Sequence, residues 1–353
     1  MLSMELDQKL DETEKNENKN APKKVQKYIF IIATWIILSV IAAFFIMSIK
    51  DEDNLTPFEK YIKAEKYLYV MDEFTPSDIL KLCESHNFKR VYLSIGIIGE
   101  YWDEYYSKGE FPPEKNGSIG YKAFIKQLNN ISVEVELVTV LEKNPEDFSK
   151  MDRVKTVANM VKSLAQEVKI KSLHFDQEPI NNSSYESLLK MYEMANEIFP
   201  TSAIVLPFWL DLKMEDLRES FKDEAFYNKF RSNSTLVDAI MNVTNLTDLM
   251  AYDQNYTEVK KILEKYKNIT ERHPHNEAKY IIEISGETNI TQRQSLHQRF
   301  IEDRDTFFNF IYDSYKEYGP LTIQYDEVWY KSLYCKWPNE SIPFDCNMPK
   351  NCT

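Results

Sequence analysis

The residues best suited to chemistry lie together in residues 173–179, which read Leu-His-Phe-Asp-Gln-Glu-Pro. On a β-strand successive side chains point to opposite faces, so His174, Asp176 and Glu178 would share one face at the strand's end. Two carboxylates that close together raise the pKa of one of them, and a carboxyl group that stays protonated near neutral pH can act as a general acid. An Asp-x-Glu can also be a charged turn that caps a helix, so the surrounding elements decide between the two interpretations.

Eight strand-like segments alternate with helix-like segments along residues 65–334. The predicted strands are residues 67–72, 90–95, 133–141, 172–178, 203–210, 248–253, 280–287 and 321–326. Apolar residues at three- and four-residue spacing indicate helices between them, and Thr75-Pro76 is a good helix start. Eight such units predict an α/β fold, a (β/α)8 TIM barrel, whose usual size is about 250 residues. An open doubly wound sheet is the alternative, although the sequence has no Gly-x-Gly-x-x-Gly and no Walker A loop.

The ends of the predicted strands carry many carboxylates and aromatic rings. In (β/α)8 barrels the functional groups lie at the carboxyl ends of the strands. Aromatic rings pack on the C–H faces of a sugar, while carboxylates accept hydrogen bonds from its hydroxyl groups. The sequence therefore predicts a carbohydrate site on one rim of the barrel. Its candidate residues are Asp176 and Glu178 after the fourth strand, Trp209 on the fifth, Tyr252 and Asp253 on the sixth, Glu287 on the seventh and Trp329 on the eighth.

Two of these motifs resemble those of chitinase-like glycosidases. Phe175-Asp-Gln-Glu178 resembles the end of their Asp-x-Asp-x-Glu motif, and Met250-Ala-Tyr-Asp253 resembles their Met-x-Tyr-Asp. The resemblance implies that Glu178 is the general acid and that Asp176 positions the acetamido group of the substrate. It also implies that Tyr252 and Asp253 help to hold that group. The two earlier aspartates of the family's motif are replaced here by Lys171 and His174.

A second resemblance is to the large clan of retaining (β/α)8 glycosidases, in which Asn-Glu-Pro ends the fourth strand and a Glu ends the seventh. Gln177-Glu178-Pro179 and Glu287 stand at those places here. This resemblance implies that Glu178 is the acid/base, that Glu287 is the nucleophile, and that Gln177 stands where an Asn contacts the sugar's 2-hydroxyl. Both resemblances make Glu178 the proton donor of a glycoside hydrolase that needs no cofactor. The alternatives are a non-catalytic domain that binds carbohydrate or another partner, and a metal-dependent phosphodiesterase that uses the same carboxylates.

Residues 28–49 form a run of 22 residues without a charge, long enough to cross a bilayer as a helix. A cleaved signal peptide is the alternative, but the run ends without a small-residue cleavage site. Three lysines precede the run and three acidic residues follow it: Lys23, Lys24, Lys27, Asp51, Glu52 and Asp53. The positive-inside rule then predicts a single-pass type II membrane protein with a disordered cytosolic tail over residues 1–27. Residues 50–64 would be a stalk, residues 65–334 the lumenal or extracellular barrel, and residues 335–353 a C-terminal tail.

Asn-x-Ser/Thr sequons are concentrated after the predicted anchor, where they begin at 13 of the 22 asparagines, and none begins at the three asparagines before it. Average Ser and Thr usage would give roughly three. The sequons begin at Asn54, Asn116, Asn130, Asn181, Asn182, Asn233, Asn242, Asn245, Asn255, Asn268, Asn289, Asn339 and Asn351. Those at Asn181, Asn182, Asn255 and Asn289 follow strands on the predicted rim. Either several of these rim sequons are unoccupied or the site takes a small ligand, and a rim crowded with glycans would also suit a barrel that has lost catalysis. We expect a glycoprotein with glycans at Asn116, Asn130, Asn233, Asn242, Asn268 and Asn339.

Composition and cysteine spacing exclude other classes of site. A net charge of -13 and a pI near 5.1 argue against nucleic-acid binding. The four cysteines have no spacing typical of a zinc site, and all follow the predicted anchor, where disulfides are permitted. Because the last barrel unit packs beside the first, Cys83 could pair with Cys335, which leaves Cys346 for Cys352. The alternative is a buried free thiol at Cys83. No metal site is predicted, and the sequence does not fix the oligomeric state.

Overall fold

The computed structural model describes residues 34–35, 37–39, 55–70, 75–113, 120–253, 255–283, 296 and 303–325. The chain divides into two units, residues 1–56 and 57–353. Within the first unit, residues 34–35 and 37–39 are helical and their side chains are exposed. The described part of the chain contains no helix that is both long and apolar enough to span a membrane. Most of the predicted anchor, residues 28–49, lies outside the described residues, so the anchor stays a prediction.

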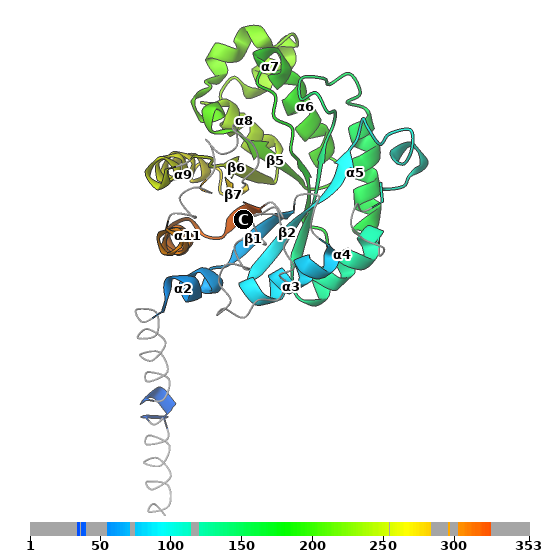
Figure 1. Cartoon of the computed structure of the whole chain (residues 1–353). Coiled ribbons are helices and arrows are strands. Elements are labelled where there is room, and N and C mark those ends of the chain that lie inside the picture. Colours follow the sequence, from blue (N-terminus) through cyan, green and yellow to red (C-terminus); the bar gives the residue numbers. More distant parts are fainter. Residues whose placement is uncertain are drawn as a thin grey trace, which may run out of the picture. The chain divides into compact units, whose positions relative to one another are not determined.

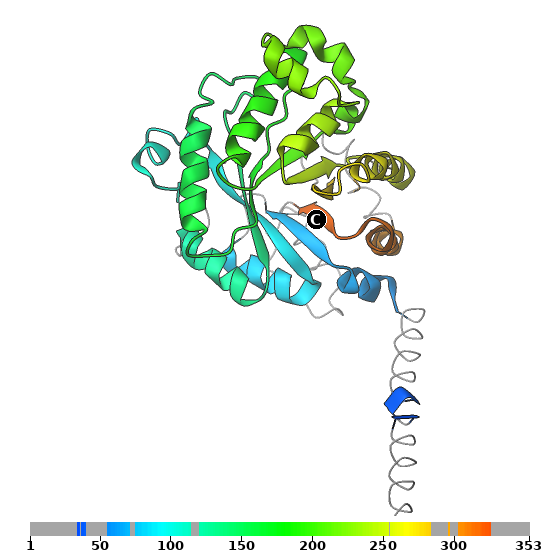
Figure 2. The ribbon, with the colours of Figure 1, turned by 180° about the vertical axis from the view of Figure 1, so that it is seen from behind.

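The second unit is a closed barrel of eight parallel strands, each paired with the next in sequence, and β8 pairs with β1. Helices surround the strands on the outside of the barrel (Figures 1 and 2). The predicted (β/α)8 fold is therefore confirmed. The strands are β1 (Lys66–Val70), β2 (Phe88–Ile97), β3 (Glu134–Val140), β4 (Ser172–Phe175), β5 (Thr201–Val205), β6 (Leu246–Met250), β7 (Glu277–Glu283) and β8 (Leu321–Tyr325).

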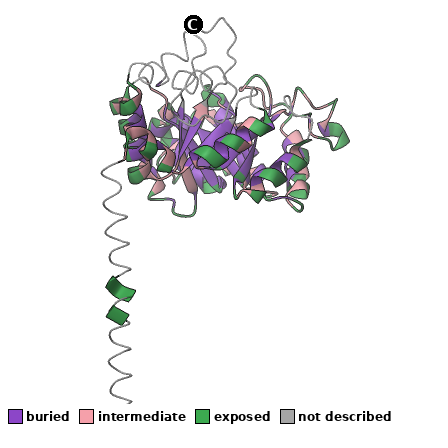
Figure 3. Cartoon of the chain, turned by 60° about the horizontal axis from the view of Figure 1, so that its bottom comes forward, coloured by how far each residue is buried: buried purple, intermediate pink, exposed green. Residues whose placement is uncertain are grey.

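The helices bury one apolar face each against the barrel, as their residue spacing predicts. In α5 the buried residues Val154, Val157, Ala158 and Val161 follow the three- and four-residue spacing of a helix face. The α-helices are α2 (Pro57–Lys63), α3 (Pro76–His86), α4 (Gly120–Asn130), α5 (Arg153–Leu164), α6 (Tyr185–Asn196), α7 (Glu224–Phe230), α8 (Leu236–Val243), α9 (Tyr256–Thr270) and α11 (Arg304–Tyr318). Short 3-10 helices are η1 (Tyr106–Lys108), η2 (Asn182–Ser184), η3 (Pro207–Asp211) and η4 (Met214–Ser220). Burial is concentrated in the strands and in the inner faces of these helices (Figure 3).

The helix α3 shows how local sequence sets a boundary. The Thr75 hydroxyl accepts a hydrogen bond from the Asp78 backbone N–H, and Pro76 occupies the first turn, where no backbone donor is needed. The helix ends at Asn87, which adopts the left-handed conformation with φ of 57°. Cys83 lies on the apolar face of this helix as a buried free thiol, and burial raises the pKa of that thiol to about 12. Cys83 is thus free among the described residues. Its predicted partner Cys335 lies outside them, as do Cys346 and Cys352, so the Cys83–Cys335 disulfide stays a prediction.

A buried arginine occupies the amino-terminal end of the barrel interior. The Arg90 guanidinium, on β2, contacts Glu134 and Glu136 of β3 at 2.6 and 2.7 Å and Glu277 of β7 at 2.6 Å. Because β2 and β7 are not neighbouring strands, this side chain spans the interior and ties opposite walls together. Only 2% of the Arg90 side chain is exposed. Lys171 adds a second cation, with its Nζ 2.8 Å from the Glu277 carboxylate.

This network should make stability depend on pH. Burial opposes the ionisation of Glu277, but the contacts with Lys171 and Arg90 outweigh it and lower the pKa of Glu277 to about 2. A carboxylate whose pKa is lowered by folding stabilises the protein above its unfolded pKa, and this contribution is lost as pH falls from about 4.5 towards 2. We expect a loss of about 2 kcal/mol in the unfolding free energy over that range, allowing for the partial exposure of Glu277. Denaturant unfolding of wild type and Glu277→Gln at several pH values tests this expectation. The variant has no carboxylate at position 277, so its unfolding free energy should fall less between pH 4.5 and 2. The exposed Glu215→Gln is the control, and identical curves for Glu277→Gln and wild type would contradict the assignment.

Candidate active site

The two carboxylates of the central motif lie just beyond the carboxyl end of β4. The strand ends at Phe175, one residue before Asp176, so it is shorter than predicted. The Asp176 backbone N–H nevertheless donates to the Thr139 carbonyl of β3 at 2.9 Å, which continues the parallel pairing by one residue. Asp176 and Glu178 are both half-buried. The structure therefore places both at the rim where (β/α)8 barrels carry their functional groups.

A tyrosine from the opposite side of the barrel holds Asp176. The Tyr69 hydroxyl, on β1, donates to Asp176 Oδ2 at 2.8 Å. Burial, together with the Asp176 carboxylate and a smaller effect of Glu178, raises the pKa of Tyr69 well above its usual value. Tyr69 therefore keeps its proton and acts as a donor at all physiological pH values. The other carboxylate oxygen, Oδ1, is buried and has no hydrogen-bond partner among the described residues.

The loop that follows Glu178 is held by one glutamate. Glu146 Oε1 accepts the backbone N–H groups of Ile180 and Asn181, both at 2.9 Å. Glu146 Oε2 accepts from the Ser184 hydroxyl at 2.5 Å. Three hydrogen bonds to a single carboxylate fix the chain immediately after Glu178. A loop held this firmly keeps the rim carboxyl group in a defined place, as a preorganised site requires.

Of the two predicted residues after β6, Tyr252 lies beside this site, whereas the contact of Asp253 is within its own loop. Tyr252 is half-buried, its hydroxyl donates to Gln324 Oε1 of β8, and it contributes to the raised pKa of Tyr69. Asp253 Oδ1 accepts from the Asn255 backbone N–H at 2.8 Å, which uses this oxygen within its own loop. Tyr252 therefore lies near the carboxylates, whereas Asp253 has at least one oxygen engaged in turn formation.

Two predicted ligand contacts need correction, because their side chains are buried in the scaffold. Trp209 is fully buried and packs edge-on against Tyr185, with ring centroids 5.9 Å apart. Gln177 is buried and its Oε1 accepts from the Leu141 backbone N–H at 2.8 Å, so it links the loops after β3 and β4. Both side chains are therefore used within the scaffold and are not exposed at the rim. Glu287 and Trp329 lie outside the described residues, as do the sequon asparagines Asn54, Asn116, Asn289, Asn339 and Asn351.

The rim instead exposes two apolar side chains that the sequence did not single out. Phe208 is 47% exposed and Ile180 is 71% exposed, and they are the exposed large hydrophobic residues within the described part of the barrel. They lie in the loops that follow β5 and β4, two neighbouring strands, and Ile180 is two residues after Glu178. Pro207 could have indicated that Phe208 is exposed. A proline interrupts a strand, and here it begins η3, so the residues after it no longer alternate between two faces.

Beneath the rim, the barrel interior holds buried charges instead of the branched apolar layers usual in such barrels. Potential ligand atoms of Glu136, His174 and Asp248 lie within 4.8 Å of one another, close enough to be considered for a metal. All four carboxylate oxygens already accept protein hydrogen bonds, from Arg90 and Ser172 at Glu136 and from Tyr92 and Ser202 at Asp248. Arg90 and His174 supply positive charge to the cluster. We therefore assign no metal to these residues.

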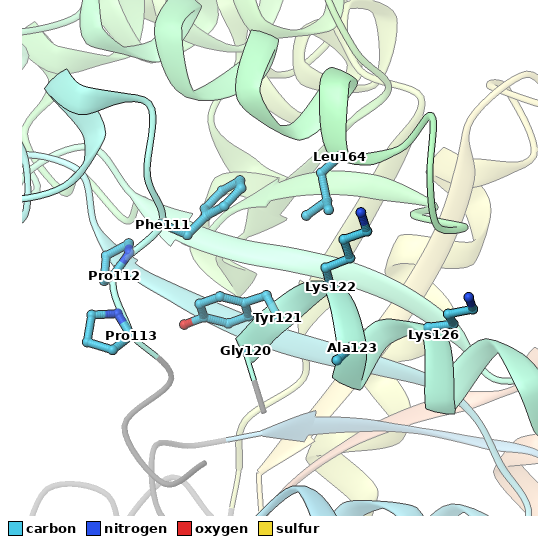
Figure 4. Close-up of a pocket in the computed structure, with 9 residues that line it drawn as sticks. All are labelled: Phe111, Pro112, Pro113, Gly120, Tyr121, Lys122, Ala123, Lys126 and Leu164. Carbon is cyan, nitrogen blue, oxygen red and sulfur yellow. The ribbon is translucent and has the colours of Figure 1, made fainter. Parts of the chain in front are cut away.

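A separate hollow of about 530 Å³ lies outside the barrel, between α4 and the end of α5 (Figure 4). Phe111 and Tyr121 form its aromatic wall, and Lys122 and Lys126 come from α4. None of the rim residues described above lines it. It is therefore not part of the candidate active site.

Comparisons with known proteins concern the fold. No family model matches the sequence, and no curated protein matches it either. A GH18 chitinase from Pseudoalteromonas aurantia is 11% identical over 76% of this chain and 98% of its own, with a TM-score of 0.46. The spore cortex-lytic enzyme SleL of Bacillus megaterium is 13% identical over 74% of this chain and 70% of its own, with a TM-score of 0.45. A xylanase-alpha-amylase inhibitor protein crystallised with trehalose is 11% identical over 75% and 94%, with a TM-score of 0.43.

These structures are distant from the chain in sequence. The fold and the function of this protein are therefore inferred from two different sets of observations. The fold is fixed by the closed ring of eight paired strands. What the protein does has to be argued from the rim residues themselves.

Proposed function

We propose that the protein is a glycoside hydrolase in which Glu178 donates a proton to the glycosidic oxygen. The observation that carries the proposal is the placement of Asp176 and Glu178 together at the carboxyl end of β4, with Tyr69 holding Asp176 from across the barrel. A proton donor must sit where the leaving oxygen of the substrate can reach it, and the rim of a closed barrel is such a place. The apolar pair Phe208 and Ile180 beside it suits the C–H faces of sugar rings.

Asp176 has the features of a group that orients the substrate. Its Oδ2 is fixed by Tyr69, while Oδ1 is buried without a partner among the described residues. A buried acceptor of this kind gains most from a donor that the substrate brings, because an unpaired buried polar atom is costly. The N–H of a 2-acetamido group is such a donor, and it agrees with the motif resemblance. We therefore propose N-acetylhexosamine glycosides as the substrate class.

Hydrolysis by the purified full-length protein tests the proposal. The substrates are aryl glycosides of several sugars together with N-acetylhexosamine oligomers, and binding of each sugar is measured in parallel. Release of the aglycone from N-acetylhexosaminides is the expected result. If the wild-type protein binds these sugars and hydrolyses none of them, the protein is a carbohydrate-binding domain and the hydrolase proposal fails.

Phe208→Ala should weaken substrate binding with little effect on folding, because the side chain is half exposed. Loss of one stacking ring is expected to cost about 1 kcal/mol, so KM should rise roughly five-fold while kcat changes little. Phe208→Tyr keeps the ring and should keep KM near the wild-type value. An unchanged KM in Phe208→Ala would show that this ring does not contact the substrate.

The proposal includes membrane attachment through residues 28–49, with the barrel on the lumenal or extracellular side. The uncharged run, its asymmetric flanks and the one-sided sequons support it. The side chains of Asn130, Asn242 and Asn268 are exposed, as glycan acceptors need to be, and Asn233 is half-buried.

Glycan removal from the full-length protein expressed in eukaryotic cells should lower its apparent mass by several glycans. Asn130→Gln should remove one glycan. Asn159→Gln, an exposed asparagine outside any sequon, should remove none. An unchanged mass after deglycosylation, together with cleavage of the barrel by a protease added from the cytosolic side, would contradict this topology.

A further inference from the structure

His174 is a buried titratable residue that the proposed proton transfer does not use. It is fully buried on β4, inside the barrel and two residues before Asp176. Its Nδ1 lies 3.0 Å from Ser202 Oγ on β5 and 3.2 Å from Asp248 Oδ2 on β6. Asp248 is itself fixed by the Tyr92 hydroxyl, which donates to its Oδ1 at 2.7 Å. The imidazole is therefore held at Nδ1 by β5 and β6, while its Nε2 is buried without a hydrogen-bond partner among the described residues.

The surroundings of His174 favour its charged form. Burial opposes protonation, but the contact with Asp248 and the negative charges of Glu136 and Asp176 outweigh burial and raise the pKa of His174 above its usual value. The same contact lowers the pKa of Asp248 in spite of its burial. The imidazole and the Asp248 carboxylate thus favour each other's charged forms inside the barrel.

Its place on the strand and one ring contact join His174 to the rim. His174 and Asp176 point into the same interior, since they are two residues apart in an extended segment. The ring of Tyr69 lies edge-on to the imidazole, with centroids 6.0 Å apart and planes at 80°, and its hydroxyl binds Asp176 at 2.8 Å. The imidazole therefore packs against the very residue that holds Asp176 in place.

We propose that His174 is a positioning residue for the hydrolysis: a buried imidazole, held by Asp248, that packs against Tyr69 and so keeps Asp176 fixed beneath the reacting bond. The effect of His174 on the reaction rate presupposes the proposed function. The motif that the chain resembles has an aspartate at this place, so His174 reverses the charge under Asp176. The titratable groups that contact the imidazole or act on it are Tyr69 on β1, Tyr92 on β2, Glu136 on β3, Asp176 after β4 and Asp248 on β6. Arg90 on β2 contacts Glu136 and also Glu277 of β7, which Lys279 contacts in turn.

The charge of His174 can be measured without any activity. The full-length protein contains five histidines, so NMR of the protein with labelled imidazole carbons gives five titrations. The signal that disappears in His174→Gln should remain that of an imidazolium to a higher pH than the signal of an ordinary histidine. In Asp248→Asn the same imidazole should become neutral at a lower pH than in wild type, because the main opposition to the effect of burial is removed. A His174 that is already neutral at pH 7 in the wild-type protein overturns the inference, whatever the activity.

Kinetics test the positioning role. His174→Gln should lower kcat by up to about 10²-fold and should move the acid limb of the pH–rate profile to higher pH, because the site loses a positive charge beneath the rim. His273→Gln is the matched control. It removes another buried His–Asp contact, from His273 Nε2 to Asp238 Oδ1 at 2.8 Å, in the outer helical layer. This control should leave the profile unchanged.

The double variant His174→Gln/Asp248→Asn guards against simple unfolding, because it removes both charges of the pair and leaves no buried ion unpaired. It should fold and keep the shifted profile. A folded variant with the wild-type profile overturns the inference while the proposed function stands. A wild-type protein inactive on every glycoside overturns the proposed function and the kinetic role together, and the NMR titration then still decides whether His174 is a buried cation.

Discussion

Replacing Glu178 with Gln is expected to lower kcat by about 10² to 10⁴, the usual contribution of general acid catalysis. The amide keeps the shape of the side chain but has no acidic proton to give to the glycosidic oxygen. The half-buried position of Glu178 and the three hydrogen bonds that Glu146 makes to the following loop should preserve the fold. Sugar affinity should therefore stay near the wild-type value while turnover collapses.

The matched control for this substitution is Glu197→Gln, an exposed carboxylate just after α6, at the far end of that helix from the rim. It should leave kcat and KM unchanged. Measured kcat values for wild type and both variants, with sugar affinities by calorimetry, decide the matter. If Glu178→Gln keeps more than about a tenth of wild-type turnover on glycosides whose leaving group needs a proton, Glu178 is not the proton donor.

Replacing Arg90 with Met should destabilise the protein by about 3–5 kcal/mol, which is the cost of leaving a buried charge uncompensated. Glu136 is fully buried, and Arg90 is the cation that contacts its Oε1 at 2.7 Å. Methionine fills most of the volume but supplies neither charge nor donors. The loss also separates β2 from Glu277 on the opposite wall of the barrel.

Denaturant unfolding at pH 7 measures this loss. The double variant Arg90→Met/Glu136→Gln should regain a large part of it, because the unpaired carboxylate is then removed, and the cycle isolates the coupling between the two residues. Arg218→Ala is the control, since that arginine lies on the exposed surface and should change stability by less than about 0.5 kcal/mol. If Arg90→Met lowers the free energy of unfolding by less than about 1 kcal/mol, Glu136 does not need Arg90 to be stable in the barrel interior.

Local sequence patterns predicted the barrel and the position of the rim carboxylates. All eight strands were found close to their predicted places, because a buried parallel strand reads as a short apolar run bounded by turn residues. Thr75-Pro76 marked the start of α3 for the same local reason. Asp176 and Glu178 could be placed on the rim because that requires only the strand direction and the general rule for such barrels.

Contacts between distant segments could not be predicted in the same way. Tyr69 and Asp176 are 107 residues apart in sequence, and Arg90 and Glu277 are 187 apart. Such pairs depend on the register and closure of the whole barrel, which no local pattern encodes. The sequence predicted that Trp209 would be exposed at the rim, but the exposed ring is that of Phe208. The cause is local: β5 ends at Val205 and η3 begins at Pro207, so the alternation of a strand does not continue to these residues.

The most direct test of the account compares wild type and Glu178→Gln across aryl glycosides whose leaving groups differ in basicity. A dinitrophenol departs without a proton, whereas methylumbelliferone and simple alcohols need one from the enzyme. If Glu178 is the proton donor, kcat/KM should fall little for the dinitrophenyl glycoside and by about 10² or more for the poor leaving groups. An equal loss for every leaving group, or no loss for any, would contradict the assignment of Glu178 as the general acid.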